Sequence, residues 1–255
     1  ELAMNVLTSA GAGGRLEIVK ELLTRWGIVE KKEEEGEGET KQNNVSSSSS
    51  SSSSSLVVVH QNPYKLTLDE KVKWVQELID ESGVVWSASG GGHANVVDLL
   101  LNVNNVNVNV VNSGATALYQ ASSCGHLNVI ETLLKRTTID VNQPRTTDGC
   151  TPLFIASATG HVQIVQTLLT RDDIDVNKSQ DGSGSTPLFM ASQNGHVQIV
   201  QTLLTRDDID VNKSDENGST PLWMAAQEGH VEVVQTLLTR DDIDVNKHNK
   251  NIGST

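Results

Sequence analysis

One block of residues recurs along the chain, and its spacing restricts the fold more than any other feature. Residues 160–178 read GHVQIVQTLLTRDDIDVNK, and residues 195–213 repeat them letter for letter. Residues 229–247 differ from them at two positions, and looser copies begin at Gly92 and Gly125. The histidine after the glycine therefore recurs at intervals of 33, 35, 35 and 34 residues. A fixed period of this length predicts stacked structural units, that is, a solenoid.

Each unit is predicted to contain two short helices. Thr186 suits a helix cap, and Pro187 suits the first helical position, where its missing N–H removes no hydrogen bond. Gly195 then ends the helix, because glycine accepts the positive φ that a tight reversal needs. Five residues of the second helix are predicted to face inwards, namely a stripe of Val197, Val200 and Leu204 with Ile199 and Leu203 beside it. One unit cannot bury both of its apolar faces, so the units must stack.

Composition supports an all-α fold and excludes several classes of partner. Aromatic residues make up only 3% of the chain, so the core must be built from Val, Leu, Ile and Ala, which suits thin helical layers. The net charge of −13 disfavours nucleic acid and anionic membranes as partners. No apolar run is long enough to predict membrane insertion. The two cysteines, Cys124 and Cys150, are too few for a disulfide framework and favour an intracellular, cytoplasmic location.

The units resemble ankyrin repeats over about residues 84–255. The matching letters are Thr-Pro-Leu at Thr151, Thr186 and Thr220, Thr-Ala-Leu at Thr116, then Gly-His, paired leucines and Asp-Val-Asn. The resemblance implies a solenoid of stacked helix-turn-helix units with protruding hairpin loops. The family usually has histidine after Thr-Pro-Leu, whereas this chain has an aromatic residue there: Tyr119, Phe154, Phe189 and Trp223.

The end of the second helix also departs from the family pattern. The family usually places a glycine there, but this chain has Thr-Arg-Asp-Asp with one extra residue. Aspartate tolerates the left-handed conformation better than most residues, so Asp172 or Asp173 is expected to adopt it in place of glycine.

The repeats are expected to fill most of the chain around one insertion. Their expected bounds are about 83–110, 111–145, 146–180, 181–214 and 215–248, and Gly253-Ser254-Thr255 predicts the start of a further repeat. Residues 1–29 are expected to be a degenerate first ankyrin repeat, because Gly14 to Val19 match the Gly-His-Val-Gln-Ile-Val of later copies.

The insertion itself is predicted to contain two different parts. Residues 30–65 are acidic and then serine-rich, so they are expected to be disordered, because such segments bury too little apolar surface to order. Residues 66–82 predict an amphipathic helix capped by Thr67. This helix also resembles residues 197–204, which leaves open whether it is the second helix of a worn repeat.

The spaced histidines and aspartates do not predict a metal site. Equivalent residues of neighbouring repeats lie about 10 Å apart, whereas zinc ligands must lie within about 2.3 Å of one point. Asp173, Asp175 and Asn177 are spaced like the start of a calcium loop, but Lys178 and Gly184 stand where that loop needs Gly and Glu. The histidines are therefore expected to be structural, and the aspartates to lie in a solvated turn.

Catalytic chemistry is not expected either. The glycine runs at 11–14 and 90–92 lack the Lys-Ser/Thr of a phosphate loop. No acid–base pair accompanies Cys124 or Cys150. The chain is therefore predicted not to be an enzyme and to need no cofactor.

The ankyrin resemblance implies that the chain binds another protein along the concave face of the stack. The resemblance places the contacts at the hairpin tips and at the end of each first helix: Thr147, Asp148, Cys150, Ala158, Thr159, Gly182, Ser183, Ser185, Gln193, Asn194, Glu216, Asn217, Ser219, Gln227 and Glu228. Two files of aspartates outnumber one file of arginines along the repeats, and the net acidic stripe that they leave is hypothesised to steer basic partners. The aspartates are Asp172, Asp207 and Asp241 in one file and Asp173, Asp208 and Asp242 in the other, and the arginines are Arg171, Arg206 and Arg240. The alternative is a substrate-recruiting or regulatory segment of a larger enzyme whose catalytic domain lies outside this chain.

Overall fold

The structure, a computed structural model, describes residues 2–28, 67–103 and 106–247. Within these ranges the regular structure is helical. In chain order the helices are α1 (Leu2–Ala12), α2 (Leu16–Arg25), α3 (Leu68–Ser82), α4 (Val84–Gly90), α5 (Ala94–Leu101), α6 (Ala117–Cys124), α7 (Leu127–Leu134), α8 (Pro152–Thr159), α9 (Val162–Leu168), α10 (Pro187–Gln193), α11 (Val197–Leu203), α12 (Pro221–Gln227) and α13 (Val231–Leu237).

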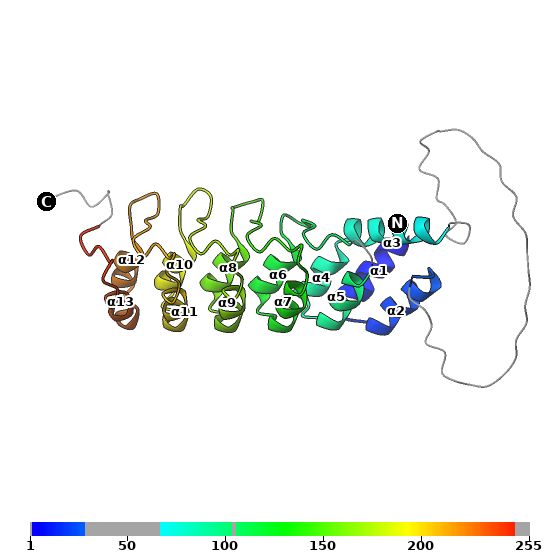
Figure 1. The fold of residues 1–255 in the computed structure, drawn as a ribbon, viewed down its shortest axis with the longest axis horizontal. Helices are drawn as coiled ribbons and strands as arrows, with labels where there is room; N and C mark the ends of the chain where they lie inside the picture. Colours follow the sequence, from blue (N-terminus) through cyan, green and yellow to red (C-terminus); the bar gives the residue numbers. More distant parts are fainter. Residues whose placement is uncertain (1, 29–66, 104–105, 248–255) are drawn as a thin grey trace, which may run out of the picture.

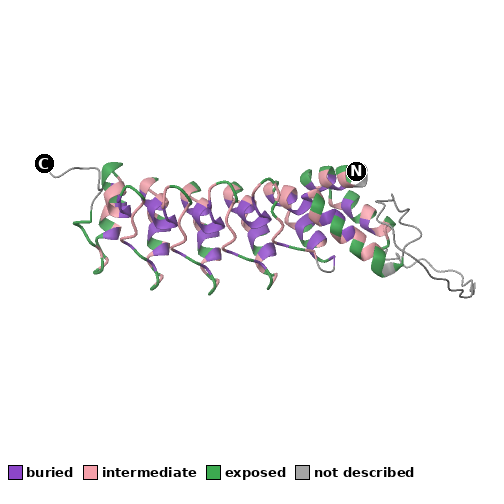
Figure 2. Ribbon diagram, turned by 90° about the horizontal axis from the view of Figure 1, so that it is seen from above, coloured by how far each residue is buried: buried purple, intermediate pink, exposed green. Residues whose placement is uncertain are grey.

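The helices stand in two parallel rows along an elongated stack, with hairpin loops along one edge (Figure 1). An inner row is formed by α1, α4, α6, α8, α10 and α12, each packed on the next. An outer row is formed in the same way by α2, α5, α7, α9, α11 and α13. Buried residues occur in every helix pair along the stack (Figure 2). The predicted all-α solenoid is therefore confirmed.

Local signals fix where the helices begin and end, as the sequence predicts. In α10 the Oγ1 of Thr186 accepts a hydrogen bond from the Phe189 N–H at 3.2 Å, and Pro187 occupies the first helical position. Gly195 has a φ of +69°. A Cβ at this glycine would also lie 2.7 Å from the imidazole of His230 in the next repeat. Gly195 is therefore required both by the turn and by the close approach of the neighbouring repeat.

The five residues predicted to face inwards from the second helix all pack on the core, but the centre of the buried face is shifted from the predicted stripe. In α11 the fully buried residues are Ile199, Val200 and Leu203, whereas Val197 and Leu204 are only partly buried. The helix packs against α10 of its own repeat and against α9 and α13 on either side. Contacts on three sides centre the buried face on residues 199–203, so Val197 and Leu204 lie at its edges.

The expected left-handed aspartate after the second helix is also wrong. Among the described residues, Ser113 is the non-glycine residue with a positive φ, so Asp172 and Asp173 do not adopt this conformation. Helix α9 ends with Leu169 still in the right-handed region. The Arg171 N–H then bonds to the Leu168 carbonyl at 3.1 Å. This tight turn satisfies carbonyls at the helix end without a left-handed residue.

Each repeated histidine joins its repeat to the one before. The imidazole Nε2 lies 2.9–3.3 Å from a carbonyl oxygen at the end of the preceding inner helix. The pairs are His93 with Ala12, His126 with Gly90, His161 with Ser123, His196 with Ala158, and His230 with Gln193. These contacts agree with a structural role for the histidines.

The asparagine that ends the Asp-Val-Asn segment, or Asn-Val-Asn at residues 107–109, forms a second link in four repeats, directed to the following repeat. The side-chain amide of Asn177 donates to the Asp208 carbonyl at 2.6 Å and accepts from the Asp210 N–H at 2.8 Å. Asn109, Asn142 and Asn212 make the same pair of bonds with their following repeats. One side chain thus satisfies two backbone groups of its neighbour, which fixes the register between repeats.

Helix α3 lies outside the two rows, along the edge that carries the hairpin loops of later repeats (Figure 1). It packs on α1 and α4, while α1 packs directly on α4 and α2 on α5. No further repeat therefore lies between the pair α1 and α2 and the pair α4 and α5, so α3 is not the second helix of a repeat. Thr67 caps α3 in a reciprocal arrangement with Glu70, as the sequence predicts. Trp74 of α3 meets Trp26 edge to face at 5.4 Å between ring centroids.

Asp80 of α3 takes the place of the asparagine that links one repeat to the next elsewhere in the stack. Its Oδ1 accepts a hydrogen bond from the Asn107 N–H at 3.2 Å. In the next repeat, the equivalent N–H of Asp140 is bound by the Asn109 side chain.

The expected disorder of residues 30–65 and the expected further repeat after residue 248 lie outside the described residues. The division of the chain into domains stays a prediction.

Candidate protein-binding face

From the threonine cap to the end of the Asp-Val-Asn-Lys segment, two neighbouring repeats differ only in the inner helix and the residue at its end. Residues 151–178 and 186–213 differ at three pairs of positions: Ile155 and Met190, Ala158 and Gln193, and Thr159 and Asn194. Their spacing of i, i+3 and i+4 places them on one face of the helix. All six side chains are partly or fully exposed, whereas the identical residues Leu153 and Leu188 are fully buried.

The same positions continue along the stack, because each inner helix packs on the next. We call this surface the inner-helix face and define it by the positions that align with Ile155, Ala158 and Thr159 in or directly after α6, α8, α10 and α12, all of which are partly or fully exposed. Its residues are Gln120, Ser123, Cys124, Ile155, Ala158, Thr159, Met190, Gln193, Asn194, Met224, Gln227 and Glu228. Backbone bonds connect the neighbouring hairpin tips, such as Asp181 N–H to the Asp148 carbonyl at 2.9 Å and Glu216 N–H to the Ser183 carbonyl at 2.9 Å.

Most of the residues expected from the sequence lie at the surface. The exposed ones are Thr147, Thr159, Gly182, Asn194, Glu216, Asn217, Gln227 and Glu228. Four more are partly buried: Asp148, Ala158, Ser183 and Gln193. This placement makes them available for contact with a partner.

Three expected residues must be removed from this surface. Cys150 is 4% exposed, Ser185 5% and Ser219 1%. Each directly precedes the threonine that caps an inner helix, at the point where the chain turns from the hairpin into the stack. Their side chains therefore lie inside, and Cys150 packs in a small apolar cluster with Tyr119 and Phe154.

The partly buried apolar residues Ile155, Met190 and Met224 were missed by the sequence interpretation. Each follows the aromatic residue of its repeat, three positions before Ala158, Gln193 or Gln227. That spacing places each on the same helix face as a residue that was identified. The helical period was therefore a sufficient signal to find them.

The hairpin tip at residues 145–150 is held by an ion pair. The Arg145 guanidinium pairs with Asp148 and lies over the Tyr119 ring, 5.1 Å from its centroid. The hydrogen bonds from Arg145 lower the pKa of Asp148 to about 2. Burial raises the pKa of the Cys150 thiol to about 12. Since the thiolate is the reactive form, Cys150 is not an activated nucleophile at neutral pH.

The groups considered for calcium make structural bonds instead. Asp173 forms a two-bond ion pair with Arg171 at 2.9 Å, and Asp175 accepts from the Asn177 N–H at 3.0 Å. Asn177 itself binds the next repeat. Within the described ranges, no group of three His, Cys, Asp or Glu residues is arranged to hold a metal ion.

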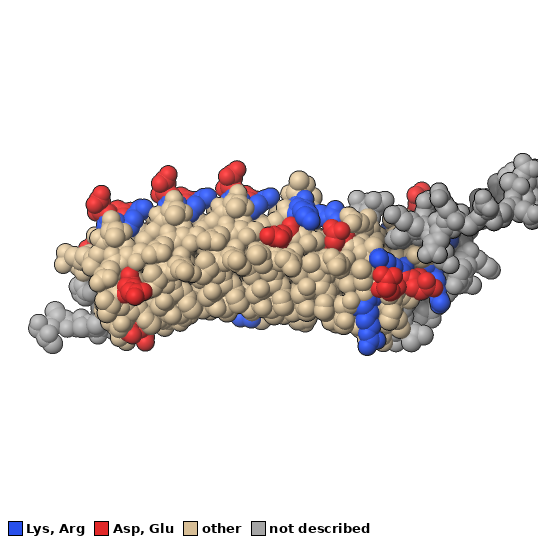
Figure 3. Space-filling view, turned by 90° about the horizontal axis from the view of Figure 1, so that it is seen from below, with Lys and Arg blue, Asp and Glu red and all other residues tan. Residues whose placement is uncertain are grey.

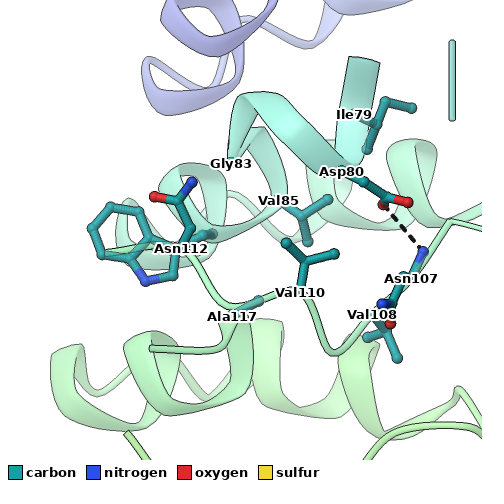
Figure 4. Close-up of a pocket in the computed structure, with 10 residues that line it drawn as sticks. Ile79, Asp80, Gly83, Val85, Asn107, Val108, Val110, Asn112 and Ala117 are labelled. Carbon is teal, nitrogen blue, oxygen red and sulfur yellow. Dashed lines mark hydrogen bonds between the residues drawn. The ribbon is translucent and has the colours of Figure 1, made fainter. Parts of the chain in front are cut away.

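A small enclosed pocket lies between α3, α4 and residues 107–117 (Figure 4). Its volume is about 10 Å³, with Ile79 and Val85 among its lining residues. Asp80 lies in its wall, and burial raises the pKa of this carboxyl. Small-molecule sites are usually about 300–1,000 Å³, so this pocket has room for a single water molecule and not for a substrate.

Charged side chains gather along one edge of the stack (Figure 3). Arg206 pairs with Asp208 and Arg240 with Asp242, in the same way as Arg171 pairs with Asp173. Each arginine thus pairs within its own repeat. The remaining aspartates of this edge, Asp172, Asp207 and Asp241, are exposed. None of the helices in the described ranges is long and apolar enough to cross a membrane.

Comparison with known proteins gives the family of these repeats. A family model for ankyrin repeats, in three copies, matches residues 64–145, 84–180 and 174–249. Its first match includes α3, although the contacts of α3 place it beside the stack and not within it. No curated protein matches the chain. Ankyrin repeats are generally protein–protein interaction modules. With the matches spanning most of its length, the chain belongs to the ankyrin-repeat family.

Proposed function

We propose that this protein binds a partner protein along the concave face of its stack, through the inner-helix face and the hairpin tips. The observation that carries the proposal is where the near-identical repeats differ. Residues that stack must suit the same neighbour in every repeat, so they stay the same. Residues that touch a partner must suit whatever lies opposite each repeat. The differences at positions 155, 158 and 159, and at the tips, follow the second pattern.

The inner-helix face also offers contacts that the tips lack. The tips are small and polar, whereas interface energy usually concentrates in larger side chains near the centre. Ile155, Met190 and Met224 form an apolar row along this face. Methionine adapts to irregular surfaces, which suits it to contact with a partner. The apolar row would supply the buried centre of an interface and the polar tips its rim.

The charge of the chain favours a basic partner. The net charge is −13, and the exposed carboxylates include Asp172, Asp207 and Asp241 on the charged edge. Complementary charge raises association rates more than it raises affinity. Substrate recruitment for a catalytic domain elsewhere in a longer protein would use the same face, so one experiment serves both alternatives.

The test compares two faces with the same chemical change. A partner captured with the full chain is purified, and its dissociation constant is measured by calorimetry. Thr159→Arg with Gln193→Arg adds two arginines to the inner-helix face. Gln163→Arg with Gln198→Arg adds two to the exposed face of the outer helices. The first pair should weaken binding by about tenfold or more, and the second should leave it nearly unchanged. Equal losses, or a loss only with the second pair, would place the interface elsewhere.

A further inference from the structure

The inner-helix face changes in apolar character from one end of the stack to the other. The position after each aromatic residue is Gln120 in α6, Ile155 in α8, Met190 in α10 and Met224 in α12. All four side chains are partly buried, so part of each remains accessible. This position of the face is therefore polar in α6 and apolar in α8, α10 and α12.

The charge of the same surface changes in the same direction. Residues 112–124 contain no charged residue, and residues 145–159 contain only Arg145 and Asp148, which pair with each other. Residues 180–194 contain Asp181 alone. Residues 215–228 contain three acidic residues and no basic one, which are Asp215, Glu216 and Glu228. The net charges along the face are thus 0, 0, −1 and −3.

Three of these carboxylates are positioned for a partner. Asp181, Glu216 and Glu228 are exposed. Among the residues that the structure describes, none of the three takes part in an ion pair, whereas Asp148 pairs with Arg145 and Asp173 with Arg171. Negative charge that is not paired with an arginine of the same chain therefore lies at the end of the face that also carries Met190 and Met224.

From this coincidence we propose that the partner contributes a basic, amphipathic peptide segment that docks on α10 and α12. Its apolar side chains contact Met190 and Met224, and its Lys or Arg side chains face Asp181, Glu216 and Glu228. The inference rests on the proposed function, because it requires the inner-helix face to be the binding surface. It goes further by stating the chemistry of the segment and the end of the stack to which it binds.

The spacing of the repeats limits the sequence of such a segment. Neighbouring repeats lie about 10 Å apart, the packing distance of helices. A polyproline II segment has three residues per turn and rises about 9 Å per turn. Every third residue would therefore meet the same position of successive repeats. The segment is expected to carry apolar residues three positions apart, with cationic residues between them.

Three synthetic peptides test this chemistry against the full chain. The first repeats Leu-Pro-Lys about five times, the second replaces Lys by Glu, and the third replaces Leu by Ser. Binding is measured by fluorescence anisotropy at about 150 mM salt, where long-range charge effects are screened. The first peptide should bind, the second should not, and the third should bind about tenfold more weakly because it lacks the apolar contacts. Equal binding of the first two peptides, or no binding of the first, would overturn the proposal.

Matched variants test the location. Glu216→Gln with Glu228→Gln removes one charge from a hairpin tip and one from the inner-helix face, and Asp172→Asn with Asp207→Asn removes two from the charged edge. All four residues are exposed, so both proteins should fold. The first pair should weaken binding of the lysine peptide by about fivefold, and the second should change it little. Equal effects would mean that only overall charge matters, which would overturn the proposed location. The arginine test of the proposed function uses the natural partner, so its outcome is independent.

Discussion

Neighbouring helix pairs are joined by different side chains in two regions of the stack, the repeats between residues 146 and 247 and the N-terminal part. Between the near-identical repeats, a histidine and an asparagine join each unit to its neighbour. Between the first two helix pairs, the histidine link remains as His93 to Ala12. The backbone group that the asparagine would bind is held by Asp80 of α3 instead.

This difference shows how a solenoid tolerates an insertion. The two rows of helices pass from α1 to α4 and from α2 to α5 without a gap, although α3 separates them in sequence. A carboxylate accepts hydrogen bonds but cannot donate one, so Asp80 makes one of the two bonds that an asparagine makes. The N-terminal link should therefore be weaker, and Trp26 against Trp74 adds apolar contact at the same end.

The largest expected effect comes from removing a buried leucine at equivalent places in the two regions. Leu203 of α11 is fully buried between repeats, whereas its counterpart Leu22 in α2 is only partly buried. Leu203→Ala should lower the free energy of unfolding by about 2–5 kcal/mol. Leu22→Ala should lower it by about 1 kcal/mol, because less apolar surface is lost. Urea unfolding followed by circular dichroism measures both. Similar losses would show that the first helix pair is packed as tightly as the interior.

A smaller effect is expected from removing one link in each region. Asn177→Ala leaves the Asp208 carbonyl and the Asp210 N–H without their partner, so it should lower stability by about 1–2 kcal/mol. Asp80→Ala removes one bond and should lower it by about 1 kcal/mol or less. Amide hydrogen exchange should report the loss at Asp210 in the first variant and at Asn107 in the second. If Asp80→Ala proves the more damaging, α3 contributes more than a substitute link.

The smallest expected effect is a loss of stability at low pH from the ion pair of Arg145 and Asp148 in one hairpin tip. Arg145 lowers the pKa of Asp148 to about 2 in the folded chain, against about 3.9 when unfolded. A lowered folded-state pKa means that the ion pair stabilises the fold fully above about pH 4. That contribution is lost as the pH falls through 2. Since the pair is partly exposed, its size should be about 1 kcal/mol or less.

Asp148→Asn is the matched control for the acid prediction. Its stability should fall less than that of the wild type between pH 4 and 2, as measured by thermal unfolding in a buffer series. Asp181→Asn, at the equivalent place in the next tip, should keep the wild-type dependence, because Asp181 has no such arginine. If Asp148→Asn loses as much stability as the wild type between pH 4 and 2, the acid sensitivity belongs to other carboxylates.

The sequence by itself determined the repeating unit and most of its boundaries. Caps such as Thr186 and Thr67, Pro187 at a helix start and Gly195 at a turn act within a few residues, so their effect can be read from neighbouring letters. The period of the histidines gave the stacking, because identical units must meet through identical faces. The same local patterns placed most candidate binding residues at the surface, and helical spacing would also have identified Met190.

Only the tertiary structure decided which side chains the neighbouring repeats cover. The burial of Cys150, Ser185 and Ser219 depends on how the hairpin turns into the stack. The use of Asp80 in place of an asparagine depends on where α3 packs. These are contacts between residues far apart in the chain, and no local pattern specifies them. A repeat sequence states what each unit is, whereas the surface it presents to a partner is what remains uncovered after the units have packed.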